Sequence, residues 1–318
     1  MDILKLSNEI IAGRRLTSGE DKSFFITADL EKLCVGADQI RRALCGDHVD
    51  LCSIINGRSG RCSENCKFCA QSAHNCTGIN EYGFLDEEDI LAECRHNAER
   101  GVHRFSIVTA GRTLSGSDFE KAVSAYKKMN DECDIELCGS HGFLTDEQFR
   151  RLREAGVKRY HCNIETSRRN FPNICTSHTF DDKIACIKRA QAAGLEVCSG
   201  GIIGMGETWE DRIDMADTLA GLGVRSVPIN ALMPIKGTPF DGLKRLSEDD
   251  ILRTVAIFRY ILPEANIRLA AGRDLMRDCG KQAFLSGADS TITGDMLTTS
   301  GNDISSDKTM LIDMGFSL

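Results

Sequence analysis

Three cysteines lie close together in the segment GRCSENCKFCAQSAH, residues 60–74. Cys62, Cys66 and Cys69 have the spacing C-x3-C-x2-C and come just after a predicted strand. Three thiolates on one short loop can converge on a single metal centre, because zinc and iron–sulfur clusters select soft thiolate ligands. The loop is polar and lacks the apolar periodicity that would bury three sulfurs, so core packing explains it poorly.

Two kinds of metal centre are compatible with this loop. A structural zinc site normally takes four protein ligands, and no second C-x2-C pair or nearby H-x3-H pair completes one, although His74 or Cys76 could be the fourth ligand. Three ligands that leave one coordination position open suit a reactive iron–sulfur cluster. The loop therefore indicates either an iron–sulfur enzyme or, from another class, a non-catalytic zinc-binding α/β protein.

Polar side chains also stand at the ends of predicted strands. In RYHCNIETS, strand alternation puts His161, Asn163 and Glu165 on one face and Cys162 on the other. The amides of Asn163 and Asn230 can each donate and accept hydrogen bonds, which suits a planar urea or amide ligand. The Glu165 carboxylate suits a pair of ribose hydroxyls. The alternative for the two amides is that they cap strand ends.

Eight short β-like runs, separated by helical patterns, must position these residues. This order predicts an α/β fold, a (β/α)8 TIM-type barrel, in which polar residues at the carboxyl ends of strands gather at the mouth. We expect an N-terminal helical extension over residues 1–46 and one domain, the barrel, over 47–318. Helix start signals stand at Asp86, at Thr145 with Gln148 as a capping box, at Thr208 and at Ser247. The runs are 49–55, 103–110, 134–140, 157–164, 195–203, 225–230, 267–272 and 290–293.

The composition of the chain limits the partners and the compartment that we expect. The 318 residues carry 39 basic and 47 acidic side chains, a net charge of −8 with the basic residues scattered, so we expect neither nucleic acid nor membrane as a partner. The 15 cysteines fall below the share typical of disulfide scaffolds. Charged residues interrupt the start MDILKLSNEIIAG, and no apolar run is long enough to span a bilayer. We therefore expect free thiols in a reducing cytoplasm.

The cysteine loop, with the aromatic Phe68 before the last cysteine, resembles the radical S-adenosylmethionine superfamily. Over most of its length the chain is similar to the biotin synthase family within it. Sister families of hydrogenase maturation and of the pyrrolysine pathway share the loop and the barrel and are the alternative. The matching pieces are CSIINGRSGRCSENCKFCAQSAH (52–74), ELCGSHG (136–142), RYHCNIETS (159–167), VCSGGIIGMGE (197–207), SVPIN (226–230), IRLAAGRD (267–274) and MLTT (296–299).

The resemblance implies a radical sulfurtransferase that converts dethiobiotin to biotin. In such an enzyme the cysteine loop holds a four-iron four-sulfur cluster, S-adenosylmethionine yields 5′-deoxyadenosyl radicals, and an auxiliary iron–sulfur cluster gives up sulfide. A flavodoxin- or ferredoxin-like protein supplies electrons, and the enzyme is a homodimer. The implied site residues are Cys62, Cys66 and Cys69 for the cluster, Phe68, Asn163, Glu165 and Ile202 for S-adenosylmethionine, and Asn163 and Asn230 for the substrate.

One ligand of the auxiliary cluster departs from the family pattern. That pattern is a two-iron cluster held by three cysteines and one arginine, of which Cys138, Cys198 and Arg268 match three positions, but the fourth is Ser106. A serine hydroxyl is a harder and far less acidic ligand than a thiol. We therefore expect either a two-iron cluster or, as a hypothesis, a four-iron type. Its replacement ligand would come from the surplus thiols Cys175, Cys279, Cys162 and Cys76, and strand parity disfavours Cys162.

The remaining candidates receive structural interpretations. Arg168, Arg169 and Lys183 could face an anionic cofactor or a substrate carboxylate, but we expect them to be exposed charges. Five histidines show no metal-ligand spacing: His48, His96, His103, His141 and His178. The other cysteines are expected to be packing residues, as small apolar side chains: Cys34, Cys45, Cys52, Cys94, Cys133 and Cys186.

Overall fold

The computed structural model describes residues 1–294 and 302–318. Its parallel strands have the sheet order β5-β4-β3-β2-β1-β9-β8-β7-β6. They close into a barrel because β5, at one end of this order, also pairs with β7, next to the other end. The strands are β1 Asp50–Arg58, β2 Arg104–Thr109, β3 Glu136–Ser140, β4 Val157–His161, β5 Glu196–Cys198, β6 Gly201–Ile203, β7 Ser226–Ala231, β8 Asn266–Leu269 and β9 Ser290–Ile292. The predicted eight-unit barrel is confirmed, and the MLTT piece at 296–299 lies outside the described residues.

A single predicted strand over 195–203 is divided in the structure into β5 and β6. The interruption is at Ser199 and Gly200, and both halves pair with β7. A side chain at residue 200 has no room, since a Cβ there would stand 1.9 Å from the carbonyl oxygen of Pro228. Gly200 thus permits the close approach of strands that the barrel requires.

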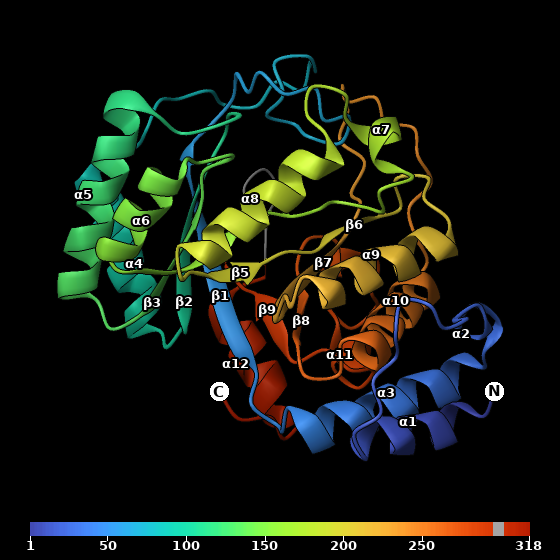
Figure 1. The fold of residues 1–318 in the computed structure, drawn as a ribbon. Coiled ribbons are helices and arrows are strands. Elements are labelled where there is room, and N and C mark those ends of the chain that lie inside the picture. The colour runs from blue at the N-terminus through green and yellow to red at the C-terminus, as the bar shows by residue number, and fades with distance from the viewer. Residues whose placement is uncertain (295–301) are drawn as a thin grey trace.

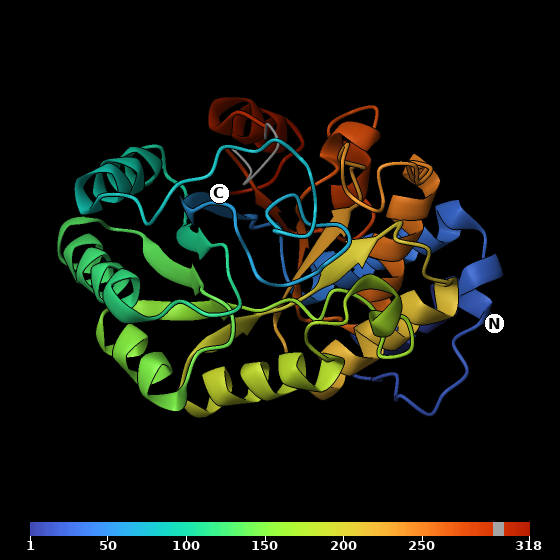
Figure 2. The ribbon, with the colours of Figure 1, turned by 90° about the horizontal axis from the view of Figure 1, so that it is seen from above.

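Helices surround the strands (Figures 1 and 2). Capping boxes begin α6, α8, α9 and α10, which confirms the starts predicted at Thr145, Thr208 and Ser247. Asp86 also precedes a helix, α4, but its side chain makes no capping bond there. The helices are α1 Ile3–Ile11, α2 Phe24–Thr27, α3 Leu30–Leu44, α4 Glu87–Glu99, α5 Gly116–Glu132, α6 Asp146–Glu154, α7 Phe171–Ile174, α8 Phe180–Ala192, α9 Trp209–Gly221, α10 Glu248–Ile261, the 3-10 turn η1 Arg273–Leu275, α11 Lys281–Phe284 and α12 Ile304–Asp313.

The N-terminal helices α1 and α3 pack together, and α3 also packs on α10 of the barrel. Tyr260 of α10 donates a hydrogen bond to the Ile3 carbonyl at 3.2 Å. In Figure 1, β1 starts on the side of these helices and runs away from them toward the loops at the opposite end. The division of the chain at residue 46 stays a prediction.

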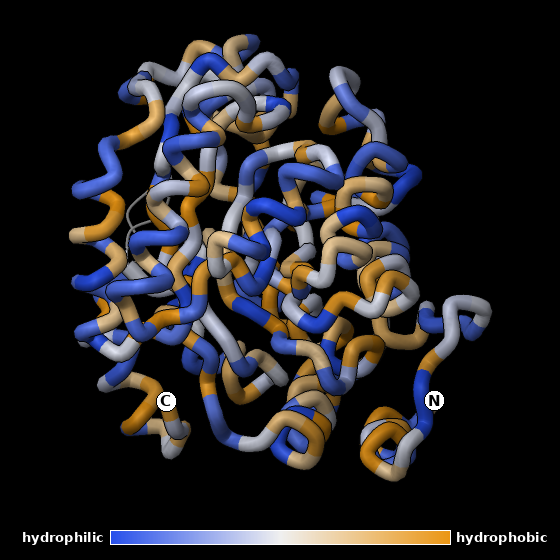
Figure 3. The backbone as a smooth tube through the Cα atoms, turned by 60° about the vertical axis from the view of Figure 1, so that its left-hand side comes forward, coloured by the Kyte–Doolittle hydropathy of each residue, from blue (hydrophilic) through white to orange (hydrophobic). Residues whose placement is uncertain are grey.

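The apolar core lies between the strands and the helices. Outward-facing strand residues such as Phe105, Ile107 and Tyr160 are fully buried in it. Along the outer helices hydrophobic and hydrophilic segments alternate (Figure 3), as in amphipathic helices that cover a barrel. The inward-facing residues of the same strands are largely polar, so the barrel interior is not a second apolar core.

The amino-terminal end of that interior is closed by a cluster of charges, here called the floor. Asp50 on β1 accepts hydrogen bonds from Arg268 at 2.7 Å and from Arg104 at 3.0 Å, and Arg159 lies 3.7 Å away. Burial alone would raise the pKa of Asp50, but Arg268, His103 and Arg104 outweigh it and lower that pKa well below its usual range. The floor therefore holds a permanent carboxylate among three guanidinium groups.

No helix within the described ranges combines the length and the apolar character that crossing a bilayer requires.

Candidate active site at the mouth of the barrel

The three-cysteine loop follows the carboxyl end of β1. Backbone hydrogen bonds fold it on itself: the Cys62 amide donates to the Gln71 carbonyl at 3.0 Å and the Cys69 amide to the Cys66 carbonyl at 3.1 Å. The Asn75 side-chain amide donates to the carbonyls of both Cys66 and Cys69. The bonds that fix the shape of the loop therefore use backbone atoms and the Asn75 side chain and do not use the cysteine sulfur atoms.

A buried carboxylate fastens the loop to the segment between α7 and α8. Glu64 accepts a hydrogen bond from the Ser177 hydroxyl at 2.7 Å, contacts Nδ1 of His178 and lies 3.3 Å from Arg112. Burial raises the pKa of Glu64, but Ser177, His178 and Arg112 together lower it below its ordinary value. Sequence reasoning missed this clamp, because Ser177 and His178 lie more than 100 residues from Glu64 in the sequence, and Arg112 lies 48 residues from it.

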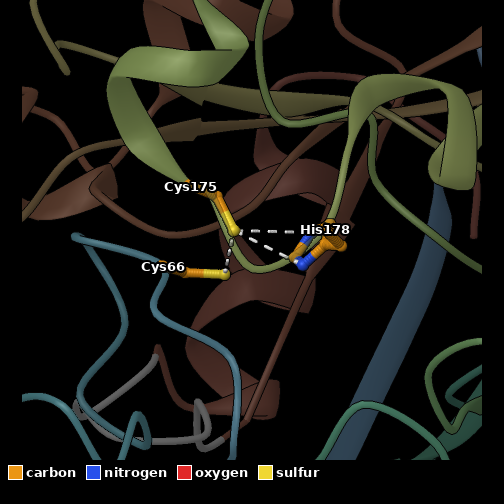
Figure 4. Close-up of side chains that lie close together, drawn as sticks. All are labelled: Cys66, Cys175 and His178. Carbon is orange, nitrogen blue, oxygen red and sulfur yellow. Dashed lines mark hydrogen bonds between the residues drawn. The ribbon is translucent and has the colours of Figure 1, made fainter.

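Two further groups meet the loop at Cys66 (Figure 4). The sulfur of Cys66 lies 3.7 Å from that of Cys175, which lies 3.4 Å from Nδ1 of His178. All three ligand atoms are within 4.8 Å of one another. The hydrogen bond from Cys66, with help from His178, lowers the pKa of Cys175 to about 3. The expectation that His178 has no metal-ligand spacing is wrong; C-x2-H in CTSH was the available signal.

Glu165 stands in a strained position four residues beyond the end of β4. Its φ of 69° is in the left-handed region, which a non-glycine residue adopts only under constraint, and such strain concentrates at functional sites. Its Oε2 is buried without a hydrogen-bond partner, and Oε1 lies 3.9 Å from Nζ of Lys183. Lys183 is only 15% exposed, so the expectation of an exposed charge there is wrong. An unpaired carboxylate oxygen held in this way is ready to accept from a ligand.

The two candidate amides hold strand ends, as the capping alternative predicted. Oδ1 of Asn163 accepts from the Gly200 amide at 2.9 Å. Asn230 donates to the Gly201 carbonyl at 3.1 Å and accepts from the Ala271 amide at 3.2 Å. These bonds orient both side chains, and each amide has further donor or acceptor capacity for a ligand.

The two apolar candidates lie in the cysteine loop and on β6. Phe68 is half-buried in the cysteine loop, between Cys66 and Cys69. Ile202 on β6 is also half-buried, and its amide donates to the Glu165 carbonyl at 2.8 Å. The backbone of Ile202 therefore lies directly beside that of Glu165, the residue predicted to bind a ribose.

Deeper in the barrel the structure brings Cys138, Cys198 and Arg268 to the interior. Arg268 influences the ionisation of Cys198, although its guanidinium group is also held by Asp50. Burial opposes ionisation of Cys198, yet a hydrogen bond with His161 and the nearby arginines lower its pKa to about 6. A buried thiol that ionises this readily is suited to bind iron.

The weaker auxiliary candidates lie elsewhere. Cys175 lies against Cys66, and Cys162 points to Cys186 of α8 on the outer side of the barrel, as strand parity predicted. Cys279 is exposed after η1, where its carbonyl accepts from Arg273, and Cys76 is exposed after the cysteine loop. The structure brings none of these four thiols to Cys138 and Cys198.

Comparisons with known proteins agree on the class. A model of the radical SAM superfamily matches residues 58–219, and a model of the biotin and thiamin synthesis associated domain matches residues 228–317. Among solved structures, methylornithine synthase (PylB) superposes with a TM-score of 0.84 at 21% identity, covering 98% of this chain and 96% of that one. The FeFe-hydrogenase maturase HydG from Carboxydothermus hydrogenoformans gives 0.80 at 20% identity, covering 99% and 78%. These likenesses show the fold.

The matched models, the cysteine loop and the closed barrel define a radical S-adenosylmethionine enzyme. The curated protein "Biotin synthase" of Alkaliphilus metalliredigens is 65% identical over the whole of both chains. That of Clostridium beijerinckii is 66% identical over 99% of each. This chain therefore belongs to the biotin synthase family, and the zinc-protein and sister-family alternatives are set aside.

The family brings a four-iron four-sulfur cluster and S-adenosylmethionine, and an auxiliary iron–sulfur cluster is typical of it. The residues present fit the first two. None of the three loop cysteines is in a disulfide, and one buried oxygen of Glu165 has no hydrogen-bond partner, so it can accept from a donor such as a ribose hydroxyl. For the auxiliary cluster, two buried thiols fit and Ser106 does not.

Proposed function

We propose that this protein inserts sulfur into dethiobiotin to form biotin. The observation that carries the proposal is the convergence at one barrel mouth of a three-thiol loop, an unpaired buried carboxylate and two oriented amides. Membership of the biotin synthase family along the full chain supports the choice of substrate. When bound, the cofactors supply radical hydrogen abstraction and the sulfur atom.

Each group at the mouth has a task in this proposal. Cys62, Cys66 and Cys69 bind the four-iron cluster, and the clamp on Glu64 fixes the loop that carries them. Glu165 accepts from the ribose hydroxyls of S-adenosylmethionine. The other assignments are Phe68 and Ile202 beside adenine, Asn163 near both ligands, Asn230 near the ureido ring of the substrate, and Cys138, Cys198 and Arg268 at the auxiliary cluster.

An anaerobic assay tests the function. Purified protein with reconstituted clusters is incubated with dethiobiotin, S-adenosylmethionine and a reductant, and biotin is scored by mass spectrometry. We expect biotin together with 5′-deoxyadenosine. Abundant deoxyadenosine without biotin would instead indicate a reaction of the sister-family type.

Substitution of Glu165 by Gln should weaken S-adenosylmethionine binding about 10- to 100-fold, because a hydrogen bond to a charged group contributes about 1.5–3 kcal/mol. Glutamine keeps the length of the side chain and removes only the charge. The KM for S-adenosylmethionine is the measurement. Glu154→Gln on the surface of α6 is the matched control, and an unchanged KM in Glu165→Gln would contradict the role.

The proposal also covers the electron donor, the oligomeric state and the compartment. The family resemblance supports a flavodoxin- or ferredoxin-like electron donor and a homodimer. Light scattering of the purified protein tests the homodimer. A reducing compartment, the cytoplasm, suits a protein in which all fifteen cysteines are free thiols.

A further inference from the structure

The inner face of the barrel carries one buried thiol that the functional assignments do not use. Cys52 lies on β1, and its inward direction follows from Asp50, two residues earlier on the same strand, which meets Arg268 and Arg104 inside the barrel. Cys52 is 9% exposed, as is Cys198, and Cys138 is 4% exposed. The question is whether these three sulfurs belong to one group.

Strand register answers it. In a TIM-type barrel the strands tilt, so that a layer across the axis advances about one residue for each strand crossed and takes its side chains from alternate strands. Cys52 pairs with Arg104 of β2, and Arg104 pairs with Glu136 of β3. Glu136 is two residues before Cys138. The layer that contains Cys52 therefore contains Cys138.

The same procedure can be repeated around the barrel: from a residue of the layer, two successive strand pairings lead to a residue that lies two positions before the next residue of the layer. After four repeats it returns to Cys52, so the layer consists of Cys52, Cys138, Cys198 and Arg268. The pairs that carry the remaining steps are Cys138–Arg159 and Arg159–Glu196, Cys198–Ser226 and Ser226–Asn266, and Arg268–Ser290 and Ser290–Asp50.

A buried positive charge belongs to the same layer. Arg268 is 2% exposed, and its guanidinium group donates a hydrogen bond to Asp50 inside the barrel at 2.7 Å. The arginine supplies positive charge beside thiols that would carry negative charge as metal ligands.

A second observation points to a ligand in this part of the interior. Ser290 stands on β9 between Asp50 and Arg268 in the register, and therefore faces inward with them. Its hydroxyl is fully buried and has no hydrogen-bond partner within the described residues. Buried polar groups are nearly always paired, so a polar group beside this layer is expected to complete it.

We propose that Cys52, Cys138 and Cys198 are the thiolate ligands of the auxiliary iron–sulfur cluster. Cys52 on β1 takes the place of the cysteine that the family pattern has on the neighbouring strand β2, where this chain has Ser106. The set of three thiols beside Arg268 is thus complete. This inference rests on the proposed function only in taking an auxiliary cluster to be present.

The test uses the full chain with Cys62, Cys66 and Cys69 replaced by Ala, in which any bound cluster is the auxiliary one. Adding Cys52→Ser keeps the size of the side chain and removes a good iron ligand. We expect iron and acid-labile sulfide per protein to fall at least about 10-fold relative to this parent. Ser106→Ala and Cys94→Ser, the latter a buried thiol of α4, should leave both contents and the Mössbauer spectrum unchanged.

A rescue variant separates a lost ligand from a lost fold. Introducing Ser106→Cys into the Cys52→Ser chain should restore the iron, because it returns a third thiol from the adjacent strand. Parent-like iron in Cys52→Ser, or continued absence of iron in the rescue variant, overturns the ligand assignment alone. A parent that holds no iron overturns the auxiliary cluster itself, and with it this part of the proposed function.

Discussion

Replacing any one of Cys62, Cys66 and Cys69 by Ala is expected to abolish biotin formation, with a loss of at least about 100-fold. Residues that merely support a metal ligand cost about 10- to 100-fold when changed, and a direct ligand should cost no less. The remaining two thiols cannot hold the cluster in one orientation, so cleavage of S-adenosylmethionine should fail as well. Assays of biotin and of 5′-deoxyadenosine by mass spectrometry measure both losses.

Cys76→Ala is the matched control for this prediction. Cys76 is exposed and lies seven residues beyond the last cysteine of the loop, so its removal should leave iron content and turnover as they are. If Cys76→Ala were as damaging as Cys69→Ala, the loop would have four protein ligands. That outcome would favour a closed metal site of the zinc type over a reactive cluster.

Asp50→Asn is expected to lower the free energy of unfolding by about 3–5 kcal/mol, because removing one partner of a buried ion pair leaves charge uncompensated. Arg159 and Arg104 have other acidic partners, Glu196 and Glu136, whereas Arg268 pairs with Asp50 among the described residues. Urea unfolding of the cluster-free protein, followed by circular dichroism, measures the change.

The exposed ion pair of Asp181 with Arg168 provides the comparison. Asp181→Asn should cost less than about 1 kcal/mol, as solvent-exposed pairs usually do. Similar losses for the two variants would mean that water reaches the floor and screens its charges, which would contradict the burial seen around Asp50.

The barrel could be predicted from the sequence because its signals are local. Each strand is a short β-like run, and capping boxes such as Thr145 with Gln148 mark where helices begin. The split of one predicted strand at Gly200 could not be foreseen, because it results from the approach of Pro228, a residue of another strand.

The site was predictable where a motif is contiguous and less so where it is assembled in space. The C-x3-C-x2-C loop is readable from spacing alone. Cys52 is a different case, since inside a strand with apolar neighbours it has the appearance of a packing residue. Its inward direction follows from the contacts of Asp50 on the same strand, and only the pairing of β1 with β2 and of β2 with β3 places it at the level of Cys138.

The contrast between the apolar outer core and the polar interior of the barrel has a consequence for how such enzymes diverge. Above the floor, stability resides in side chains that point away from the chemistry, so selection can exchange the inner residues without dismantling the scaffold. The PylB structure keeps this scaffold at 21% identity. With Ser106 on β2 and Cys52 on β1, the proposed thiolate ligand lies on a strand next to the one that the family pattern uses. Such an exchange changes the ligand set and leaves the barrel unchanged.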